Sequence, residues 1–365
     1  MLPMRNPWNY IVDRVDLRRE CFFEELNAPC ERVVPCDQVI DDTEPSCSSS
    51  GRFARLFKKC IKGTHVWGNY IYEIDNAGSD GNAHGYRIQR SGVAVGVDRD
   101  IKNSNTWIGM MFAYDNGRLN VHSNKVSGAK SDDFNIGLYH RTLFQKGWEW
   151  KNYLGMGYQR YNMWRNVDLG LTNLVWDPSL QFYTGKTEEY TGQFGSRFNG
   201  YSMALSTELA RPFFCGENDR WFVRPYMALD VNGFWQGSAS EDPNSFAKAH
   251  YLALDYHRTN DIRTYWRPGL QVERGGPRGS IRGQVAYSFR IGGRGYTSVD
   301  NQFQYGGESF NMRGVDDGIG FVTVNLGTSL FLDKKKTSLA TFDYWLFSGG
   351  ASTTQALQLG AQKQF

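Results

Sequence analysis

The chain of 365 residues lacks any window close to the roughly 18 consecutive apolar residues that a membrane-spanning helix requires. This absence excludes a helical membrane protein. It does not exclude a closed barrel, whose strands are apolar on one face only. A surplus of charge of one sign is also missing, since 41 lysines and arginines nearly balance 38 aspartates and glutamates. No nucleic-acid partner is therefore indicated.

Catalytic and cofactor motifs are absent as well. The six histidines are scattered, without HExxH, GxSxG or P-loop spacing, so we expect neither enzymatic activity nor a cofactor. His250, Asp255, His257 and Asp261 lie close together in sequence, but an external loop explains them better than a metal site. The glycines of 291–295 follow an expected strand with no helix after it, which is typical of a hairpin loop rather than a phosphate-binding loop.

Cysteine is scarce beyond residue 60: only Cys215, of the six cysteines, lies there. The spacing contains no CxxC pair, so a zinc site is not expected. In an exported chain the cysteines would form disulfides whose connectivity the sequence leaves open. The amino terminus has neither the apolar core nor the small-residue cleavage site of a secretory signal. An exported protein would then begin upstream of Met1; a product that is not exported is the alternative.

Glycine and aromatic residues are abundant instead, with 40 Gly, 23 Phe, 20 Tyr and 11 Trp, although the mean hydropathy is only −0.53. From residue 64 onward the apolar residues recur with the period of two that is typical of strands. Val93, Val95 and Val97, for example, share one face, while Gly96 and Asp98 share the other. Twelve segments of this kind are predicted, at 64–75, 86–101, 105–121, 131–145, 147–165, 196–214, 220–238, 259–274, 279–292, 318–332, 336–348 and 353–365.

An even number of such strands predicts an all-β fold, an antiparallel up-and-down transmembrane β-barrel of about 12 strands. Both termini then lie at the periplasmic end, and the terminal Phe365 belongs to the apolar face of the last strand. The longer connections, predicted as external loops, are 122–130, 166–195, 239–258 and 293–317. The shorter ones, predicted as periplasmic turns, include 145–147 and 333–335.

The polar face of the strands mixes small residues with charges, which suits a narrow, hydrated lumen. The residues predicted to face this lumen are Asp98, Asp115, Arg141, Glu149, Glu208, Arg224, Asp230, Arg267, Glu273, Arg282 and Asp343. Aromatic residues near strand ends are interpreted as interfacial girdles, with ordinary core aromatics as the alternative. These are Trp107, Trp148, Trp150, Trp221, Trp266 and Tyr344.

The first 63 residues differ from the rest and show no alternation. Residues 1–50 form a Cys-rich segment, and 51–63 contain apolar residues at i, i+3, i+4, i+7 and i+8. This spacing predicts a short amphipathic helix, and its basic residues are Arg52, Arg55, Lys58 and Lys59. The helix could lie in the lumen against the carboxylates or on a surface, and the residues themselves leave both positions open.

Several short motifs occur in an order that resembles the autotransporter β-domain of Gram-negative bacteria, over roughly residues 64–365. They are Gly92, Gly96 and Asp98 in one strand, Trp107 and Gly109 in the next, Gly137 and Tyr139, then Gly155, Gly157, Tyr158 and Arg165, and finally Pro225 and Tyr226. The carboxyl terminus resembles the signal read by the barrel-assembly machinery, through Gln358, Gly360 and Phe365. Lys363 departs from that pattern, which prefers an apolar residue there.

The resemblance implies a monomeric outer-membrane barrel, embedded in lipid, that exports and anchors its own amino-terminal passenger. Residues 1–50 would be a passenger remnant or extension, 51–63 the linker helix in the lumen, and 64–365 the barrel. Residues 51–62 contain no asparagine, so the self-cleavage of some family members is not expected. The alternatives are a small-solute pore or structural barrel without a passenger, and a soluble β-sandwich binding module.

Overall fold

The computed structural model describes residues 63–365, apart from 82, 102–104, 123–126, 145–146, 178–181, 216–220, 244–249, 277, 317 and 335–336. The Cys-rich segment and the amphipathic helix predicted for residues 1–62 lie outside the described residues.

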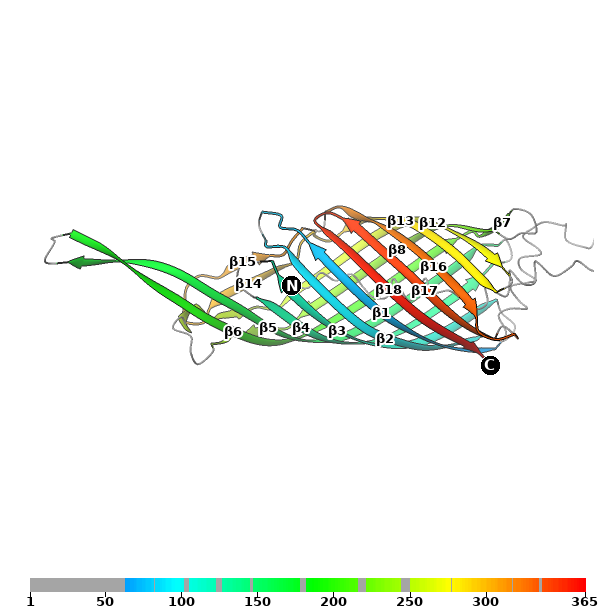
Figure 1. Cartoon of the computed structure of the whole chain (residues 1–365), viewed down its shortest axis with the longest axis horizontal. Coiled ribbons are helices and arrows are strands. Elements are labelled where there is room, and N and C mark those ends of the chain that lie inside the picture. Colours follow the sequence, from blue (N-terminus) through cyan, green and yellow to red (C-terminus); the bar gives the residue numbers. More distant parts are fainter. Residues whose placement is uncertain are drawn as a thin grey trace, which may run out of the picture.

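Twelve long antiparallel strands form the wall of a barrel (Figure 1). In chain order they are β1 (Thr64–Ala77), β2 (Tyr86–Asp100), β3 (Thr106–Val121), β4 (Gly128–Leu143), β5 (Glu149–Asp177), β6 (Phe182–Ala210), β8 (Trp221–Gln236), β12 (Thr259–Gly276), β13 (Gly279–Gly292), β16 (Gly320–Phe331), β17 (Ser338–Gly349) and β18 (Ser352–Gln364). Each pairs with the strands before and after it, and β1 pairs with β18. The predicted barrel of twelve strands is confirmed, and the β-sandwich alternative is wrong because one sheet closes on itself.

The pairing between the first and last strands explains why the chain ends on an aromatic residue. Pairing runs without a break from His65 opposite Gln364 to Ala77 opposite Ser352. The backbone N–H of Phe365 donates to the carbonyl of Thr64 at 2.9 Å, so the terminus is fixed to the beginning of β1. We call this end of the barrel the termini end and the opposite end the loop end.

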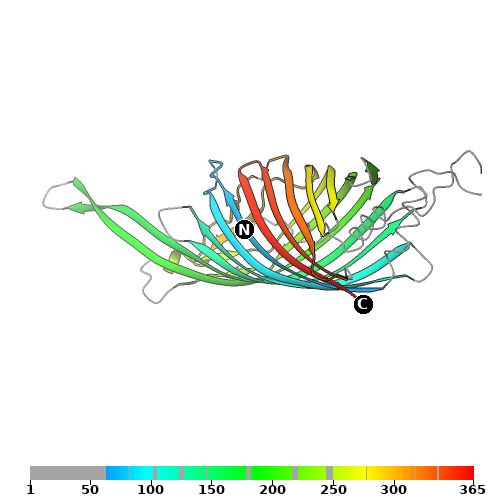
Figure 2. The same ribbon diagram turned by 45° about the vertical axis from the view of Figure 1, so that its right-hand side comes forward.

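The expectation of a loop at 166–195 is wrong. Strands β5 and β6 continue through it as one ladder, from Trp164 opposite Gly195 to Asp177 opposite Phe182. The resulting hairpin projects far beyond the other strands (Figures 1 and 2). The sequence-based limit failed because strand length was matched to membrane thickness, which constrains only the part of a strand that lies in lipid.

Two other expected loops carry secondary structure of their own. Four short strands form a second sheet, which we call the cap sheet: β9 (Ala239–Ser240), β11 (Leu254–Tyr256), β14 (Ser298–Phe303) and β15 (Phe310–Arg313). Next to it, β10 (Asp242–Pro243) pairs with Phe194 and Gly195 of β6. The remaining short strand, β7 (Phe213–Cys215), pairs with β8 at the termini end. A 3-10 turn at His250–Leu252 precedes β11.

The two faces of the barrel wall differ in burial. Large apolar side chains such as Val95, Phe112 and Leu138 are half exposed on the outer surface, whereas polar residues such as Asn325 and Gln358 are buried. A soluble protein would show the reverse arrangement. Among the residues that the structure describes, no helix is long and apolar enough to cross a membrane.

Substitutions on the outer surface and on the buried side of the wall should lower the unfolding free energy by different amounts. Val95→Arg on the outer surface should destabilise the barrel in lipid vesicles by roughly 2–4 kcal/mol, because a charge would enter the hydrocarbon region. Gln284→Asn on the buried face, where Gln284 donates to the Tyr226 hydroxyl at 2.6 Å, should cost only about 1 kcal/mol. Denaturant unfolding followed by tryptophan fluorescence measures both, and equal costs would contradict the assignment of the faces.

Candidate functional site: the buried face of the barrel wall

The eleven charged residues predicted to face a lumen are all buried. Two of their ion pairs, Arg224–Glu149 and Arg282–Asp343, join strands that are not neighbours and pass over the strand between them. Side chains converge in this way on the concave side of a closed sheet and diverge on its convex side. We call this surface the buried face; most of its charges fall into four groups, with Glu273 and Asp98 outside them.

The first group lies towards the termini end and is centred on Arg224 of β8. Its Nε donates to Oε2 of Glu149 on β5 at 2.6 Å, across β6, and its Nη2 donates to Glu208 on β6. Arg141 of β4 also pairs with Glu149, and Nζ of Lys151 lies 3.4 Å from Oε1 of Glu208. Arg224 and the two glutamates are 0–1 % exposed, so each charge depends on its partners for compensation.

The second and third groups lie farther round the wall. Nε of Arg267 donates to Oδ2 of Asp230 at 2.9 Å, and the hydroxyl of Ser206 donates to Oδ1 at 2.5 Å. In the third group, Arg282 of β13 pairs with Asp343 of β17, passing over β16. Glu273 of β12, another of the predicted residues, accepts a hydrogen bond of 2.5 Å from Ser280.

The fourth group was only partly predicted. Asp115 of β3 lies opposite Asp133 of β4, and Arg90 of β2 lies near both and within 3.7 Å of Glu73 on β1. Of these only Asp115 was predicted. The sequence contained a signal for both missed acids. Asp133 lies on the same face of its alternating strand as Asn135, and Glu73 lies on the same face as Asp75. Two opposed carboxylates beside one guanidinium leave this part of the buried face acidic.

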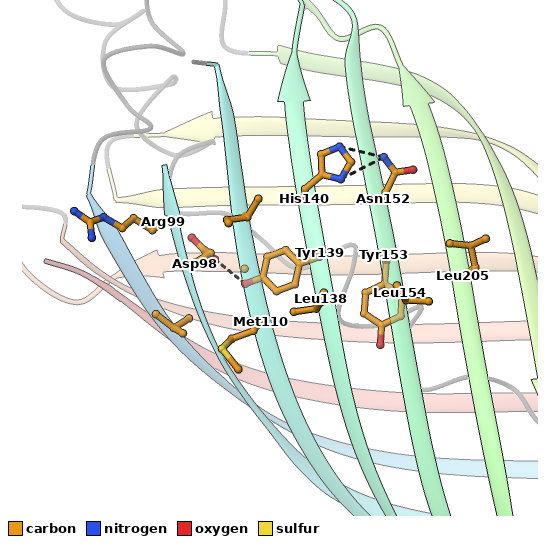
Figure 3. Close-up of a pocket in the computed structure, with 13 residues that line it drawn as sticks. Asp98, Arg99, Met110, Leu138, Tyr139, His140, Asn152, Tyr153, Leu154 and Leu205 are labelled. Atoms are coloured by element: carbon orange, nitrogen blue, oxygen red, sulfur yellow. Dashed lines mark hydrogen bonds between the residues drawn. The ribbon is translucent and has the colours of Figure 1, made fainter. Parts of the chain in front are cut away.

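At the termini end, a series of hydrogen-bonded side chains extends from Asp98. Of its members, only Asp98 was among the residues predicted to face the lumen. The Tyr139 hydroxyl donates to Oδ2 of Asp98 at 2.8 Å and accepts from Nε1 of Trp67 at 2.8 Å, while Nδ1 of His65 lies 3.3 Å from Oδ1 of Asp98. Figure 3 shows Tyr139 of β4 reaching across β3 to Asp98 of β2, and His140 turned towards Asn152. These hydrogen bonds connect β1, β2 and β4.

Glycines explain how the aromatic rings lie flat on the wall. A Cβ at Gly96 would collide with the Trp67 ring, and one at Gly109 with the Tyr139 ring. The same holds for Gly137 and Gly155 beneath Tyr153. Four glycines of the motifs that resembled a known family are therefore sites of ring packing, where any side chain would displace an aromatic residue. The other two, Gly92 and Gly157, lie instead against Asp115 and against Asn135 and Ser202.

The girdle interpretation is wrong for Trp107, and for the other aromatic residues it stays a prediction. Trp150, Trp221 and Trp266 are about 40 % exposed on the outer surface. Trp107 is 2 % exposed on the buried face, where the Arg141 guanidinium lies 4.6 Å from its ring centroid. Trp107 alternates with the outward-facing Ile108, so its place in the period of two outweighs its position near a strand end.

The outer wall carries a cavity of about 530 Å³ beside the termini end of β2–β6 (Figure 3). Six of its thirteen lining residues are outward-facing and apolar, namely Val97, Ile108, Met110, Leu138, Leu154 and Leu205. His140 and Asn152 border it, and the His140 ring lies edge-on to Trp150 at 5.1 Å. The cavity offers hydrocarbon contacts and no cluster of catalytic groups.

The cap sheet is fastened to the loop end of the wall by Glu241. Arg165 of β5 binds this carboxylate with two hydrogen bonds, of 2.9 and 2.6 Å, and the Tyr256 hydroxyl donates to it at 2.5 Å. Burial raises the pKa of the Tyr256 phenol, and the negative charge of Glu241 raises it further. Burial would by itself lower the pKa of Arg165, but its bonds to Glu241 raise it, so Arg165 stays charged.

For residues 250–261 the sequence favoured an external loop over a metal site; the chain there forms the 3-10 turn, β11 and the start of β12. No group of His, Cys, Asp and Glu side chains suited to a metal ion occurs among the described residues. Asp261 accepts hydrogen bonds of 2.6 Å from both Arg263 and Thr297, beside the cap sheet.

A closed, tilted barrel with an apolar outer surface and a charged interior defines the class of outer-membrane β-barrels. Within this class, the family model of the autotransporter beta-domain matches residues 66–344, so the chain belongs to the autotransporter β-domain family. It is an outer-membrane translocator barrel, and members of this family reside in the outer membrane of Gram-negative bacteria and carry an amino-terminal passenger.

Solved structures show the same fold. The translocator domain of the autotransporter NalP from Neisseria meningitidis is 11 % identical, with a TM-score of 0.60 over 86 % of this chain and 94 % of that one. The β domain of the Bordetella autotransporter BrkA is 17 % identical, with a TM-score of 0.51 over 83 % and 100 %. A variant of the monoaromatic hydrocarbon channel TodX reaches a TM-score of 0.50 at 7 % identity, over 83 % and 91 %. No curated protein sequence matches the chain.

The ring packing predicts a specific coupling between Gly96 and Trp67. Gly96→Val should destabilise the barrel by about 1–3 kcal/mol, because the new side chain overlaps the ring. In a Trp67→Ala background the same substitution should cost much less. A double-mutant cycle of unfolding free energies measures the coupling. Gly195→Val is the control, since a Cβ at Gly195 has open space around it, and additivity of Gly96→Val and Trp67→Ala would contradict the packing.

Within the first group, removal of the Arg224 charge should reduce the unfolding free energy most. Arg224→Met leaves Glu149 and Glu208 buried without their main partner, so the unfolding free energy should fall by about 3–5 kcal/mol. Adding Glu149→Gln and Glu208→Gln should restore most of that loss, because the uncompensated charges disappear. Unfolding in detergent or vesicles distinguishes the two variants; no recovery in the triple variant would mean that packing rather than charge dominates.

Proposed function

We propose that the barrel exports and anchors its amino-terminal passenger, with the basic segment 51–63 held against the buried face as the wall of a lumen. The observation that carries this proposal is charge complementarity. Buried acids of the wall outnumber buried lysines and arginines. The acids are Glu73, Asp75, Asp98, Asp115, Asp133, Glu149, Glu208, Asp230, Glu273 and Asp343; the cations are Arg141, Lys151, Arg224, Arg263, Arg267 and Arg282, together with Arg90, whose side chain is 11 % exposed.

The course of the chain agrees with this role. Gly63 lies at the termini end, where its N–H donates to Oδ1 of Asp100 at 3.3 Å, so the preceding segment meets the barrel there. The basic residues Arg52, Arg55, Lys58 and Lys59 come directly before this point. Opposite charges in a poorly hydrated interior attract more strongly than in water, which favours their location beside the acidic fourth group.

The carboxyl-terminal residues support assembly by the barrel-assembly machinery. Phe365 is 71 % exposed next to the β1–β18 pairing, although its backbone is paired, so its ring is accessible to a partner. Gln358 is buried, and a Cβ at Gly360 would collide with Asn69 and Thr341, so these two positions also serve packing. Because the sheet closes within one chain, no unpaired wall strand calls for a second copy, and we propose a monomer.

Export can be tested with the full chain placed behind a secretory signal and a cysteine-free reporter domain, in a Gram-negative host. Reversing the four charges, with Arg52→Glu, Arg55→Glu, Lys58→Glu and Lys59→Glu, should reduce the surface-exposed reporter at least tenfold. The reason is repulsion from the acidic buried face. Protease accessibility of the reporter on intact cells is the measurement.

The matched control keeps the charge, with Arg52→Lys, Arg55→Lys, Lys58→Arg and Lys59→Arg, and should export normally. Heat-dependent migration on a detergent gel shows whether each barrel has folded. A folded charge-reversed barrel that exports like the unmodified chain would contradict the proposed position of the segment. A folded barrel that leaves every reporter in the periplasm but conducts small solutes would instead support the pore alternative.

A further inference from the structure

The outer surface of β2–β6 is arranged in registered rows of side chains. One row consists of Val93, Tyr114, Phe134, Tyr158 and Tyr201, each opposite the next across neighbouring strands. Ring centroids in this row are 5.1 Å apart for Tyr114 and Phe134 and 5.5 Å for Tyr158 and Tyr201. Towards the termini end the next two rows are apolar, so the aromatic row marks the border of the hydrocarbon-facing surface on the loop side.

Towards the loop end the outward positions become basic instead. Arg118 lies directly opposite Lys130, Asn162 lies opposite Arg197, and Arg160 lies one outward position closer to the aromatic row. We call Arg118, Lys130, Arg160 and Arg197 the basic patch. All four side chains are exposed, and Arg160 lies directly opposite Asp132 of β4.

This arrangement is unfavourable for the barrel by itself. Like charges that face each other across neighbouring strands destabilise a sheet, and here Arg118 faces Lys130 without a carboxylate bound to either. The nearest acid in the register, Asp132, instead accepts a hydrogen bond of 2.9 Å from the Tyr114 hydroxyl. An external anion would offset the repulsion.

The patch also borders a hollow. A cavity of about 370 Å³ is lined by Arg118, Lys130 and Asp132 together with hydrogen-bonding side chains of β2 and β3, namely Gln89, Ser91 and Asn116; the Asp132 carboxylate accepts the hydrogen bond from Tyr114. At the same end of the barrel, on its other side, the outward residues include Ile262, Ile291 and Val322, which are exposed and uncharged. Within β2–β6, the basic patch lies directly above the aromatic row.

We propose that the basic patch binds the phosphorylated headgroup of an outer-leaflet glycolipid of the lipid A class. Its phosphates lie against Arg118 and Lys130, and its acyl chains lie along the aromatic and apolar rows below. Arginine and lysine are the residues that bind phosphate most strongly, and a lipid supplies both the anion and the hydrocarbon that these adjoining surfaces match. The proposal rests on the outer-membrane location and not on passenger export.

The test uses the full chain folded in detergent micelles that contain increasing fractions of bisphosphorylated lipid A. Native mass spectrometry counts the lipid molecules retained per barrel. The unmodified barrel should retain the lipid, and Arg118→Ala with Lys130→Ala should raise the half-saturating lipid fraction roughly 30-fold, at about fivefold per cation. The matched control, Arg274→Ala with Arg278→Ala, removes two exposed cations at the termini end and should leave retention unchanged.

Chemically dephosphorylated lipid A identifies the group that is bound and should be retained weakly by every variant. Equal retention of both lipids would overturn the proposal, because hydrocarbon contacts would then suffice. Retention by the Arg118→Ala and Lys130→Ala variant at the unmodified level, with normal heat-dependent migration, would also overturn it. So would a barrel that is stabilised by inorganic phosphate but retains no bisphosphorylated lipid.

Discussion

The constraint on which the whole structure depends is that every wall strand has a hydrogen-bonded neighbour on both sides. Backbone groups that face lipid have no water to bind, so an open edge would be prohibitively costly. Pairing of β1 with β18 removes the edge between the two ends of the chain. This explains why the sequence continues its alternation to the last residue, where the Phe365 N–H still donates to Thr64.

Closure in turn determines how the interior is filled. A twelve-stranded wall curves strongly enough for side chains to meet across an intervening strand, as Arg224 meets Glu149 and Arg282 meets Asp343. Rings such as Trp67 and Tyr139 can lie over the wall only where a glycine stands beneath them. The interior is thus a network of ion pairs and flat rings in which buried acids outnumber buried lysines and arginines.

The outside of the barrel follows a different rule, set by the surrounding solvent. Apolar and aromatic rows cover the sector that faces hydrocarbon, and cations gather where this sector ends towards the loop end. Beyond the membrane the wall no longer needs an apolar surface. There β5 and β6 continue as a hairpin, and the cap sheet is held to the wall by the buried pair of Arg165 and Glu241.

The sequence by itself determined the strands, their number and the face of each residue, because a period of two is a local property and closure follows from it. It also identified Arg224, Glu149 and Glu208 as charges on the polar face. Only the tertiary structure decided which of these charges meet, since partners such as Asp98 and Tyr139 are set by register and curvature and not by sequence distance. The same limit concealed the cap sheet, whose β11–β14 pairing joins residues far apart in the chain. The β5–β6 extension is a local hairpin, and it was missed because no membrane thickness sets the length of a hairpin beyond the lipid.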